Sequence, residues 1–266
     1  MGRFFGTSLP FLGKIKLGGE VAFWTDSEES TYWLSRTYSR YTPMGWFAGD
    51  SEKLRIGPDS PPPPQESLKR ELVFQSLQPT FDTKGLLSGG NMDWISREAV
   101  IHTLSPMRFQ IEIQKPERDA EFPEEVQRIA AEIRETFGLP VTTFIESTIT
   151  RMLPPDLVLN GVSYTGDESK TYVGRVYLTR MRPTVPDVVS WRFTEQLDAN
   201  DTYEMNSFVS KATPDDLRTA GTNYSGFITD HYLQLPSALP QRVRDLASEL
   251  TLEAVTPLDK ALAVRD

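Results

Sequence analysis

Nine short segments rich in β-branched and aromatic residues recur over the first 210 residues, and they constrain the fold more than any other feature. They lie at residues 20–25, 31–41, 71–77, 108–113, 143–153, 156–164, 171–181, 188–193 and 202–210. Residues of these types favour the half-buried surface of a pleated sheet. In the fourth segment, Phe109, Ile111 and Ile113 alternate with polar residues, which places them on one face of a strand. The sequence therefore predicts a mainly β protein.

Helical patterns are fewer and are concentrated late in the chain. Residues 122–140 carry one apolar stripe and are bounded by Pro123 at the start and Gly138 at the end. The stripe consists of Val126, Ile129, Ala130, Ile133 and Phe137. Residues 212–221 form a short capped helix, with Thr213 at the N-cap and Asp216 three positions later. Residues 239–250 are amphipathic through Leu239, Val243, Leu246, Ala247 and Leu250.

These elements together predict an α+β protein whose body is an antiparallel β-sandwich-like domain. The β-rich domain covers residues 1–211, and residues 117–182 form a helix-containing subdomain inserted into it. Residues 166–169 are the expected hairpin turn within that insertion. Residues 212–266 form a helical C-terminal tail.

Charge and composition exclude several functions. The formal net charge of -9 argues against a nucleic-acid partner, which requires a basic surface. The absence of cysteine excludes disulfides, thiol catalysis and a cysteine zinc site within this chain. No apolar run reaches the length of about 18–20 residues that a membrane span needs. The apolar stretch near the N-terminus is too short and interrupted for a signal peptide.

Residues that could support catalysis or bind metal are sparse. The two histidines, His102 and His231, lie in segments without a partner nucleophile, and the nucleophile-elbow pattern of hydrolases is absent. Asp198, Asn200 and Asp201 lack the glycine and closing glutamate of a calcium loop, so they are expected to form a turn. We therefore expect no enzymatic activity, no cofactor and no metal site in this chain.

Aromatic residues crowd into one short region and are the candidate binding residues. They are Trp24, Tyr32, Trp33, Tyr38, Tyr41 and Trp46. Aromatic faces stack on the apolar faces of sugars and peptides, so this aromatic cluster could line a binding groove. The alternative is that the same side chains form the core of a strand pair.

A short helix is expected at the C-terminal end. Thr256 suits an N-cap, Pro257 the first helical position and Asp259 the third. An isolated helix of this length is marginal in water, so we expect it to fray unless it docks on the β-rich body or another molecule.

Two regions of the chain resemble the bacterial membrane-anchored transglutaminase-like family of the TgpA type. Residues 32–46 resemble the family pattern Tyr-Trp-Arg-Gly, then Tyr-Asp-x-Tyr-Thr-Gly-x-Gly-Trp, and residues 13–23 are similar to its extracytoplasmic entry. The matching residues are Tyr32, Trp33, Tyr38, Tyr41, Thr42, Gly45 and Trp46, while Leu34, Ser35 and Ser39 depart from the pattern.

The resemblance is closer over residues 201–266, which are similar to the family's lead-in to its catalytic core. It is carried by residues 232–236 together with Val243, Leu246, Ala247, Thr251, Thr256, Pro257, Asp259, Lys260 and Ala261. Residues 55–195 show no such resemblance.

The resemblance implies a membrane-anchored parent protein whose extracytoplasmic region ends in a papain-like core with a Cys-His-Asp triad. No residue here matches that triad, so the chain is expected to be a non-catalytic extracytoplasmic module. It would lie on the outer face of the bacterial cytoplasmic membrane and position the catalytic core or its substrate. Its expected partners are that core and the parent's membrane helices. The alternative function is a binding module for an envelope polymer such as peptidoglycan, another glycan or a peptide, which would use the aromatic cluster. The oligomeric state does not follow from the sequence.

Overall fold

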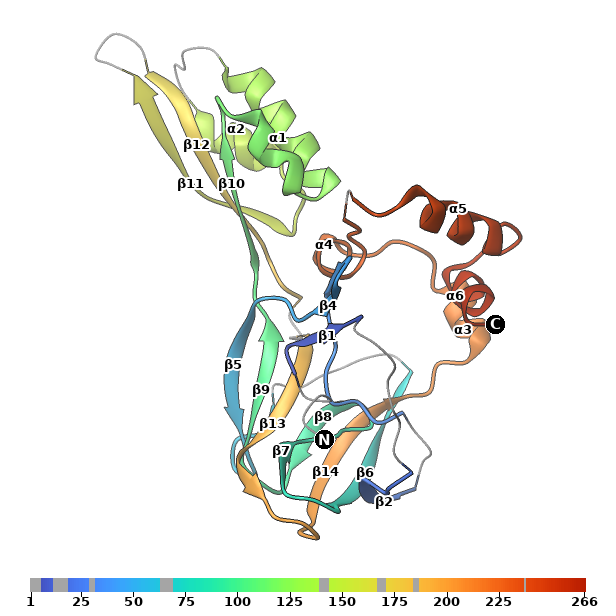
Figure 1. Cartoon of the computed structure of the whole chain (residues 1–266). Helices are drawn as coiled ribbons and strands as arrows, with labels where there is room; N and C mark the ends of the chain where they lie inside the picture. Colours follow the sequence, from blue (N-terminus) through green and yellow to red (C-terminus); the bar gives the residue numbers. More distant parts are fainter. Residues whose placement is uncertain are drawn as a thin grey trace. The chain divides into compact units, whose positions relative to one another are not determined.

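The computed structural model describes residues 6–11, 19–28, 32–62, 69–138, 144–166, 171–183, 187–236 and 238–266. The chain divides into two compact units (Figure 1). Unit 1 comprises Met1–Leu104, Thr184–Asn223 and Leu235–Asp266, and unit 2 comprises Ser105–Pro183 and Tyr224–Gln234. The chain therefore passes between the units four times.

The described part of unit 1 contains three antiparallel sheets. Two have four strands, in the orders β5-β9-β13-β7 and β2-β6-β14-β8, and one has three, in the order β1-β4-β3. Their strands are β1 (Ser8–Pro10), β2 (Phe23–Ser27), β3 (Arg40–Thr42), β4 (Gly45–Phe47), β5 (Ser51–Ile56), β6 (Arg70–Pro79), β7 (Thr83–Gly85), β8 (Asn91–Ile95), β9 (Ala99–Leu104), β13 (Val188–Leu197) and β14 (Tyr203–Ser210). The predicted mainly β, α+β class is confirmed.

Both four-stranded sheets contribute side chains to one hydrophobic core. Ile101 and Trp191 come from one sheet, and Leu77 and Met205 come from the other. The alternation of side chains along each strand turns every second residue toward this core. Tyr203 is fully buried there, and its hydroxyl donates a hydrogen bond of 3.2 Å to the carbonyl of Leu87. Burial raises the pKa of Tyr203, so the phenol stays protonated and keeps its hydrogen bond to Leu87.

Unit 2 is built on a three-stranded antiparallel sheet in the order β10-β12-β11, with helices packed against it (Figure 1). Its elements are β10 (Met107–Glu112), the 3-10 helix η1 (Pro116–Glu121), α1 (Glu124–Phe137), α2 (Ile145–Met152), β11 (Leu157–Gly166), β12 (Thr171–Arg180) and α4 (Gly226–Tyr232). The apolar stripe of α1 is buried, and Ile129 and Ile133 share a core with Phe109 and Val176 of the sheet. The stripe expected from the sequence therefore faces the sheet.

The prediction of a strand at residues 143–153 is wrong, because α2 occupies Ile145–Met152. The segment is rich in threonine and isoleucine, and those residue types favoured a strand. Ile145, Ile149 and Met152 are nevertheless spaced at three and four residues, and all three pack into the core of unit 2. Tertiary packing of this stripe outweighs the intrinsic preference.

The strand expected at residues 31–41 is also largely absent. Its described part forms isolated bridges at Leu34 and Arg36, and regular pairing begins only with β3. The predicted hairpin turn at 166–169 falls mainly outside the described residues, which resume at Thr171. Unit 2 also extends beyond the expected insertion at 117–182, since it includes β10 and the later segment Tyr224–Gln234.

A buried arginine links that later segment to the rest of unit 2. The guanidinium of Arg180, at the end of β12, is inaccessible to solvent. Its Nε donates to Asp230 of α4 at 2.9 Å, its Nη1 to Asp156 at 3.0 Å and its Nη2 to Glu125 of α1 at 2.7 Å. Phe227 of α4 is also buried. These contacts explain why the segment belongs to unit 2.

The C-terminal part of unit 1 contains α3 (Pro214–Thr219), α5 (Gln241–Leu250) and α6 (Pro257–Arg265). The expected capping box is present, since Thr213 accepts from the backbone amide of Asp216 and the Asp216 carboxylate accepts from the amide of Thr213. No residue of these three helices is buried. Among the described residues, none of the helices combines the length and apolarity required to cross a membrane.

Candidate aromatic binding surface

The structure separates the six aromatic residues of the predicted cluster. Trp33 is partly buried and packs against the core of unit 1. Trp24 lies on β2, beside Gln78 of β6, and is exposed. Tyr32 is exposed and precedes Leu34, which forms an isolated β-bridge with Ser88. Only Tyr38, Tyr41 and Trp46 lie at or beside the three-stranded sheet, so a single groove lined by all six side chains does not form. Of the two alternatives, Trp33 agrees with packing in the core, whereas Trp24, Tyr32 and Trp46 are exposed.

Three strands place a row of apolar side chains on one face of the small sheet. Trp46 of β4 is paired with Leu9 of β1 on one side and Tyr41 of β3 on the other. Directly paired residues of antiparallel strands project to the same face. Phe11 follows Leu9 by two residues and continues the same side, and its backbone amide donates to the carbonyl of Met44 at 3.1 Å.

The rings in this row touch one another and remain open to solvent. The centroids of Tyr41 and Trp46 are 5.0 Å apart with planes inclined by 64°, and those of Phe11 and Tyr41 are 5.9 Å apart. Trp46 is 37% exposed and Phe11 54%. We call Leu9, Phe11, Tyr41 and Trp46 the aromatic surface. Phe11 was not among the predicted residues, although its spacing of two from Leu9 is a strand signal.

The turn between β3 and β4 allows β1 to approach closely. Gly45 has a φ of +143°, and a Cβ at this position would lie 2.4 Å from the Leu9 carbonyl oxygen. Thr42 stabilises the turn, because its hydroxyl donates to the Gly45 carbonyl at 3.0 Å and accepts from the Met44 amide at 3.2 Å. The Tyr38 hydroxyl donates to the carbonyl of Gly6, 3.0 Å away. These hydrogen bonds fix the turn from Thr42 to Gly45 and link Tyr38 to the segment that precedes β1.

The aromatic surface suits stacking rather than chemistry. The guanidinium of Arg40 lies 5.8 Å from the Phe47 ring, and this cross-strand pair is on the opposite face of the sheet. Arg40 therefore does not lie on the face that bears Tyr41 and Trp46. Such a face binds flat apolar ligand surfaces such as those of sugar rings.

His102 pairs with a serine, and the charged groups that shift its pKa among the described residues are all cations. Its Nδ1 is 3.3 Å from the Ser51 hydroxyl oxygen. The pKa of His102 is lowered, first by burial and then by the positive charges of Arg36, Arg192 and Lys53. A general base that activates serine needs a carboxylate to stabilise the imidazolium, whereas these neighbours oppose it. The pair is not an activated nucleophile.

The other predicted candidates form ordinary structural contacts. His231 lies on α4 with its ring 4.1 Å from that of Phe227, and its Nδ1 is 2.9 Å from the Phe227 carbonyl. Asn200 adopts a left-handed φ of 69°, and the Asp201 amide donates to the Asp198 carbonyl at 3.1 Å. The segment around Asn200 is therefore a turn, as expected. Within the described ranges, no group of three or more potential metal ligands is found.

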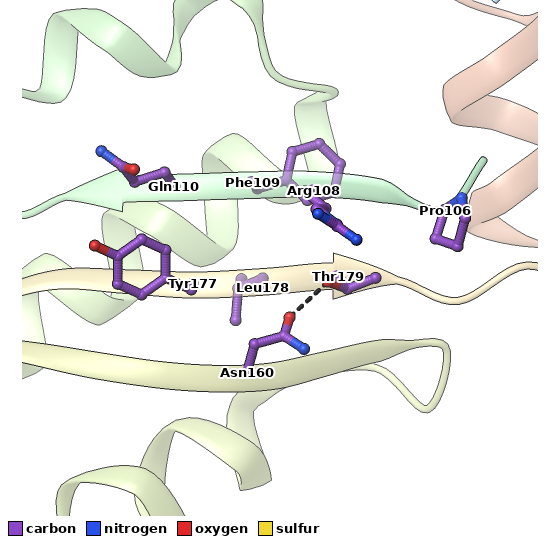
Figure 2. A pocket seen from close by; sticks show the side chains of 8 residues that line it. All are labelled: Pro106, Arg108, Phe109, Gln110, Asn160, Tyr177, Leu178 and Thr179. Carbon is purple, nitrogen blue, oxygen red and sulfur yellow. Dashed lines mark hydrogen bonds between the residues drawn. The ribbon is translucent and has the colours of Figure 1, made fainter. Parts of the chain in front are cut away.

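Unit 2 presents a shallow hollow of about 630 Å³ on its sheet (Figure 2). Arg108 and Gln110 of β10 and Tyr177 of β12 line it, and the Thr179 hydroxyl donates to the Asn160 side-chain oxygen at 2.5 Å. The lining mixes one cation, amides and a phenol without a titratable pair in contact. Pro106, Phe109 and Leu178 complete the lining, so the hollow is of mixed polar and apolar character.

Comparison of the chain with known protein families, curated proteins and solved structures gave no match. The function is therefore argued from the sequence resemblance and the geometry of the structure.

Proposed function

We propose that this chain is a non-catalytic extracytoplasmic module that positions a partner domain, the catalytic core of a membrane-anchored protein resembling the TgpA-type transglutaminases. Its body is proposed to be sandwich-like, with the two four-stranded sheets as its layers. The module would act on the outer side of the bacterial cytoplasmic membrane. The similarity of residues 201–266 to the family's lead-in supports this assignment.

The observation that carries the proposal is the uncovered apolar stripe of α5. Val243, Leu246 and Leu250 lie at spacings of three and four residues and are 42%, 54% and 46% exposed. Amphipathic helices gain most of their stability by burying such a stripe against a partner. No residue of α5 is buried, although α5 contacts α6. The stripe is thus a surface suited to receive another domain.

Polar contacts hold the neighbouring helices in place. The Nε of Arg218 on α3 donates to the Asp259 carboxylate of α6 at 2.9 Å. Lys69, just before β6, forms an ion pair of 3.4 Å with Asp216 of α3. These surface contacts are individually weak, at about 0–1 kcal/mol each. They can orient the helices while leaving the α5 stripe free for a partner.

Stability measurements on Leu246→Gln and Leu250→Gln test whether the stripe is free. We expect each substitution to change the free energy of unfolding by less than about 0.5 kcal/mol, as is usual at an unpacked surface. The control is Leu178→Ala in the core of unit 2, which should cost about 2–5 kcal/mol. A loss at Leu246 as large as the control would show that the stripe packs within the chain.

A separate assay tests the non-catalytic role. Incorporation of a labelled amine by the purified chain above a blank without protein would contradict that role.

A second candidate function follows from the aromatic surface. Its exposed rings favour an envelope polymer with flat apolar faces, such as a glycan strand, as the bound ligand. This activity is compatible with a positioning role, since it would use a different surface of unit 1.

Co-sedimentation with purified cell-wall sacculi tests the second candidate. The double variant Tyr41→Ala/Trp46→Ala should weaken binding by about tenfold or more, because each ring contributes about 0.5–1.5 kcal/mol. Trp24→Ala is the matched control, since Trp24 is an exposed tryptophan on β2 outside the aromatic surface. Equal sedimentation of the double variant and the original protein would reject the aromatic surface as the binding site.

A further inference from the structure

The outer face of the sheet β5-β9-β13-β7 gathers positively charged side chains from four separate segments. Lys53 and Arg55 lie on β5, His102 on β9 and Arg192 on β13. Arg36 comes from the bridged segment before β3. We call Arg36, Lys53, Arg55 and Arg192, together with His102, the cationic face.

Strand register places these side chains together. Lys53 is paired with His102, and His102 is paired with Ser190. Ser190 in turn forms a bridge with Arg36, so one row runs across four segments. The adjacent row contains Arg55 and Arg192, both paired with Val100 of β9. Paired residues share a face, and neighbouring strands are about 5 Å apart, so the row from Lys53 to Arg36 spans about 15 Å with His102 between its ends.

The opposite face of the same strands is the core of unit 1. Ala99 and Ile101 of β9 and Trp191 and Phe193 of β13 are buried there. These residues alternate with Val100, His102, Ser190 and Arg192, which lie on the outer face. The cationic face is therefore on the side of the sheet away from this core, where Lys53, Arg55 and Arg192 are exposed and Ser190 is buried.

The positive charges of the cationic face are not neutralised within the described part of the chain. Arg36, Lys53, Arg55 and Arg192 form no ion pair there. Burial and then the charge of Arg192 lower the pKa of Arg36. The Nε of Arg36 is buried and has no hydrogen-bond acceptor. A buried unsatisfied donor costs about 1–3 kcal/mol, so an acceptor at this position would be stabilising.

This excess of positive charge occurs in a protein of net charge -9, where carboxylates outnumber basic residues 37 to 28. Among the described residues, none of these four cations has a carboxylate within ion-pair distance. Their placement around a single histidine indicates a site for a negatively charged group.

We propose that the cationic face is a binding site for an oxyanion that carries at least two negative charges, such as a phosphate group. Guanidinium groups donate two parallel hydrogen bonds to phosphate oxygens, which suits Arg36 and Arg192. Lys53 adds a mobile ammonium, and protonated His102 adds a further donor. This site is independent of both the α5 stripe and the aromatic surface, so its test does not depend on the proposed function.

Proton NMR of the two histidines tests the proposal directly with inorganic pyrophosphate as the probe. The pKa of His102 is depressed by burial and by Arg36, Arg192 and Lys53, and a bound anion would offset those charges. Saturating pyrophosphate should therefore raise the pH midpoint of the His102 ring by about half a unit or more. His231, in unit 2, is the internal reference and should not move. The variant His102→Asn assigns the two resonances.

Charge-removing variants locate the site. Lys53→Gln is exposed and should fold normally, and it should weaken pyrophosphate binding about threefold or more. Arg36→Gln/Arg192→Gln should abolish the shift of His102. Arg128→Gln is the matched control, because Arg128 is an exposed residue of α1 that carries the same charge in unit 2. An unchanged His102 midpoint at millimolar pyrophosphate, or equal weakening by Arg128→Gln, would overturn the proposal.

Vesicle binding distinguishes the source of the phosphate. Co-sedimentation with phosphatidic acid vesicles, whose headgroup is a phosphate monoester that can carry two negative charges, would identify a lipid headgroup if Arg36→Gln/Arg192→Gln abolishes it. A pyrophosphate response without such co-sedimentation would identify a soluble phosphate group. Both results include the His102 response to pyrophosphate, and the absence of that response would refute the site whatever the vesicles do.

Discussion

Each nitrogen of the Arg180 guanidinium donates to a different carboxylate, and the resulting charged cluster lies in the interior of unit 2. Burial opposes the charge of Arg180, but the hydrogen bond to Glu125 and the charges of Asp230 and Asp156 raise its pKa overall. For Asp230 burial is the larger effect, and its pKa is raised despite the adjacent guanidinium. The cluster is therefore stable only as a set, because each member compensates the burial of the others.

Replacing Arg180 with methionine should unfold unit 2 at markedly lower denaturant concentration. Arg180→Met leaves Asp230 buried beside two further carboxylates without a cation, and such a change typically costs about 3–5 kcal/mol. Urea unfolding monitored by far-ultraviolet circular dichroism measures the loss in the free energy of unfolding. Arg128→Met, an exposed change on α1, is the control. A cost below about 1 kcal/mol at Arg180 would mean that the carboxylates relax into solvent.

At the scale of elements, α6 depends on its N-terminal contacts more than on packing. Thr256 accepts from the backbone amide of Asp259 at 3.2 Å, as predicted for an N-cap. Its hydroxyl also donates to the Asp259 carboxylate at 2.6 Å, and Arg218 donates to the same group. The helix forms contacts with α3 and α5, yet none of its residues is buried. Its order therefore relies on a few polar bonds.

The helicity of α6 should fall in acid before the β-sheets unfold. The side chains of Thr256 and Arg218 hold the pKa of Asp259 below its usual range. A carboxyl group with a depressed pKa stabilises the folded state above its ordinary pKa of about 3.9, and that contribution is lost as the pH falls through the lower folded value. Cα chemical shifts of residues 257–265 recorded from pH 6 to pH 2 measure it.

The control for that titration is Asp259→Asn, which removes the ionisable group. Its α6 shifts should be less helical at pH 6 and should not change further between about pH 4 and pH 2. An identical acid response in the original protein and in Asp259→Asn would assign the change to another group.

Elements with strong local signals were predictable from the sequence, whereas their partners were not. The stripe of α1 and the cap of α3 follow from spacing and residue type alone. The strand prediction at 143–153 failed because β-branched content was weighed above the spacing of Ile145 and Ile149. The candidate site shows the same division. Aromatic content pointed to Tyr41 and Trp46, but only pairing between strands reveals that Phe11 joins them and that Trp33 does not.

The cationic face lies beyond sequence reasoning for a similar physical reason. Arg36, Lys53, His102 and Arg192 are separated by 17 to 90 residues along the chain, and none of them belongs to a local sequence motif. Register between strands brings them together, and a register shift by one residue would disperse them to opposite faces. Non-local pairing of this kind has no local signal.

At the scale of the whole molecule, the interleaving of the two units depends on the attachment of α4 to unit 2. Gly226, the first residue of α4, lies directly against the Arg180 guanidinium. A Cβ there would lie 2.5 Å from the guanidinium carbon and 2.8 Å from an Asp156 oxygen. The guanidinium cannot move aside freely, because three carboxylates fix it. Only glycine allows the segment to dock at this distance.

Gly226→Ala should therefore weaken unit 2 although it adds a single methyl group. We expect a loss of about 1–3 kcal/mol, the usual cost of overpacking, with hydrogen exchange accelerating across α4 and the end of β12. Gly161→Ala in β11 of the same unit is the control, because an added Cβ there meets no atom within 4 Å. Equal stability of the two variants would show that the cluster shifts without cost.

The position of Asp230 in the sequence also determines when unit 2 can be completed during synthesis. Arg180 leaves the ribosome 50 residues before Asp230, with the last two strands of unit 1 between them. At about 5–20 residues per second, the interval lasts roughly 3–10 s. During that time Arg180 has Glu125 and Asp156 but lacks Asp230, and the site for Phe227 is empty. Unit 2 is therefore completed only after β13 and β14 of unit 1 have been synthesised.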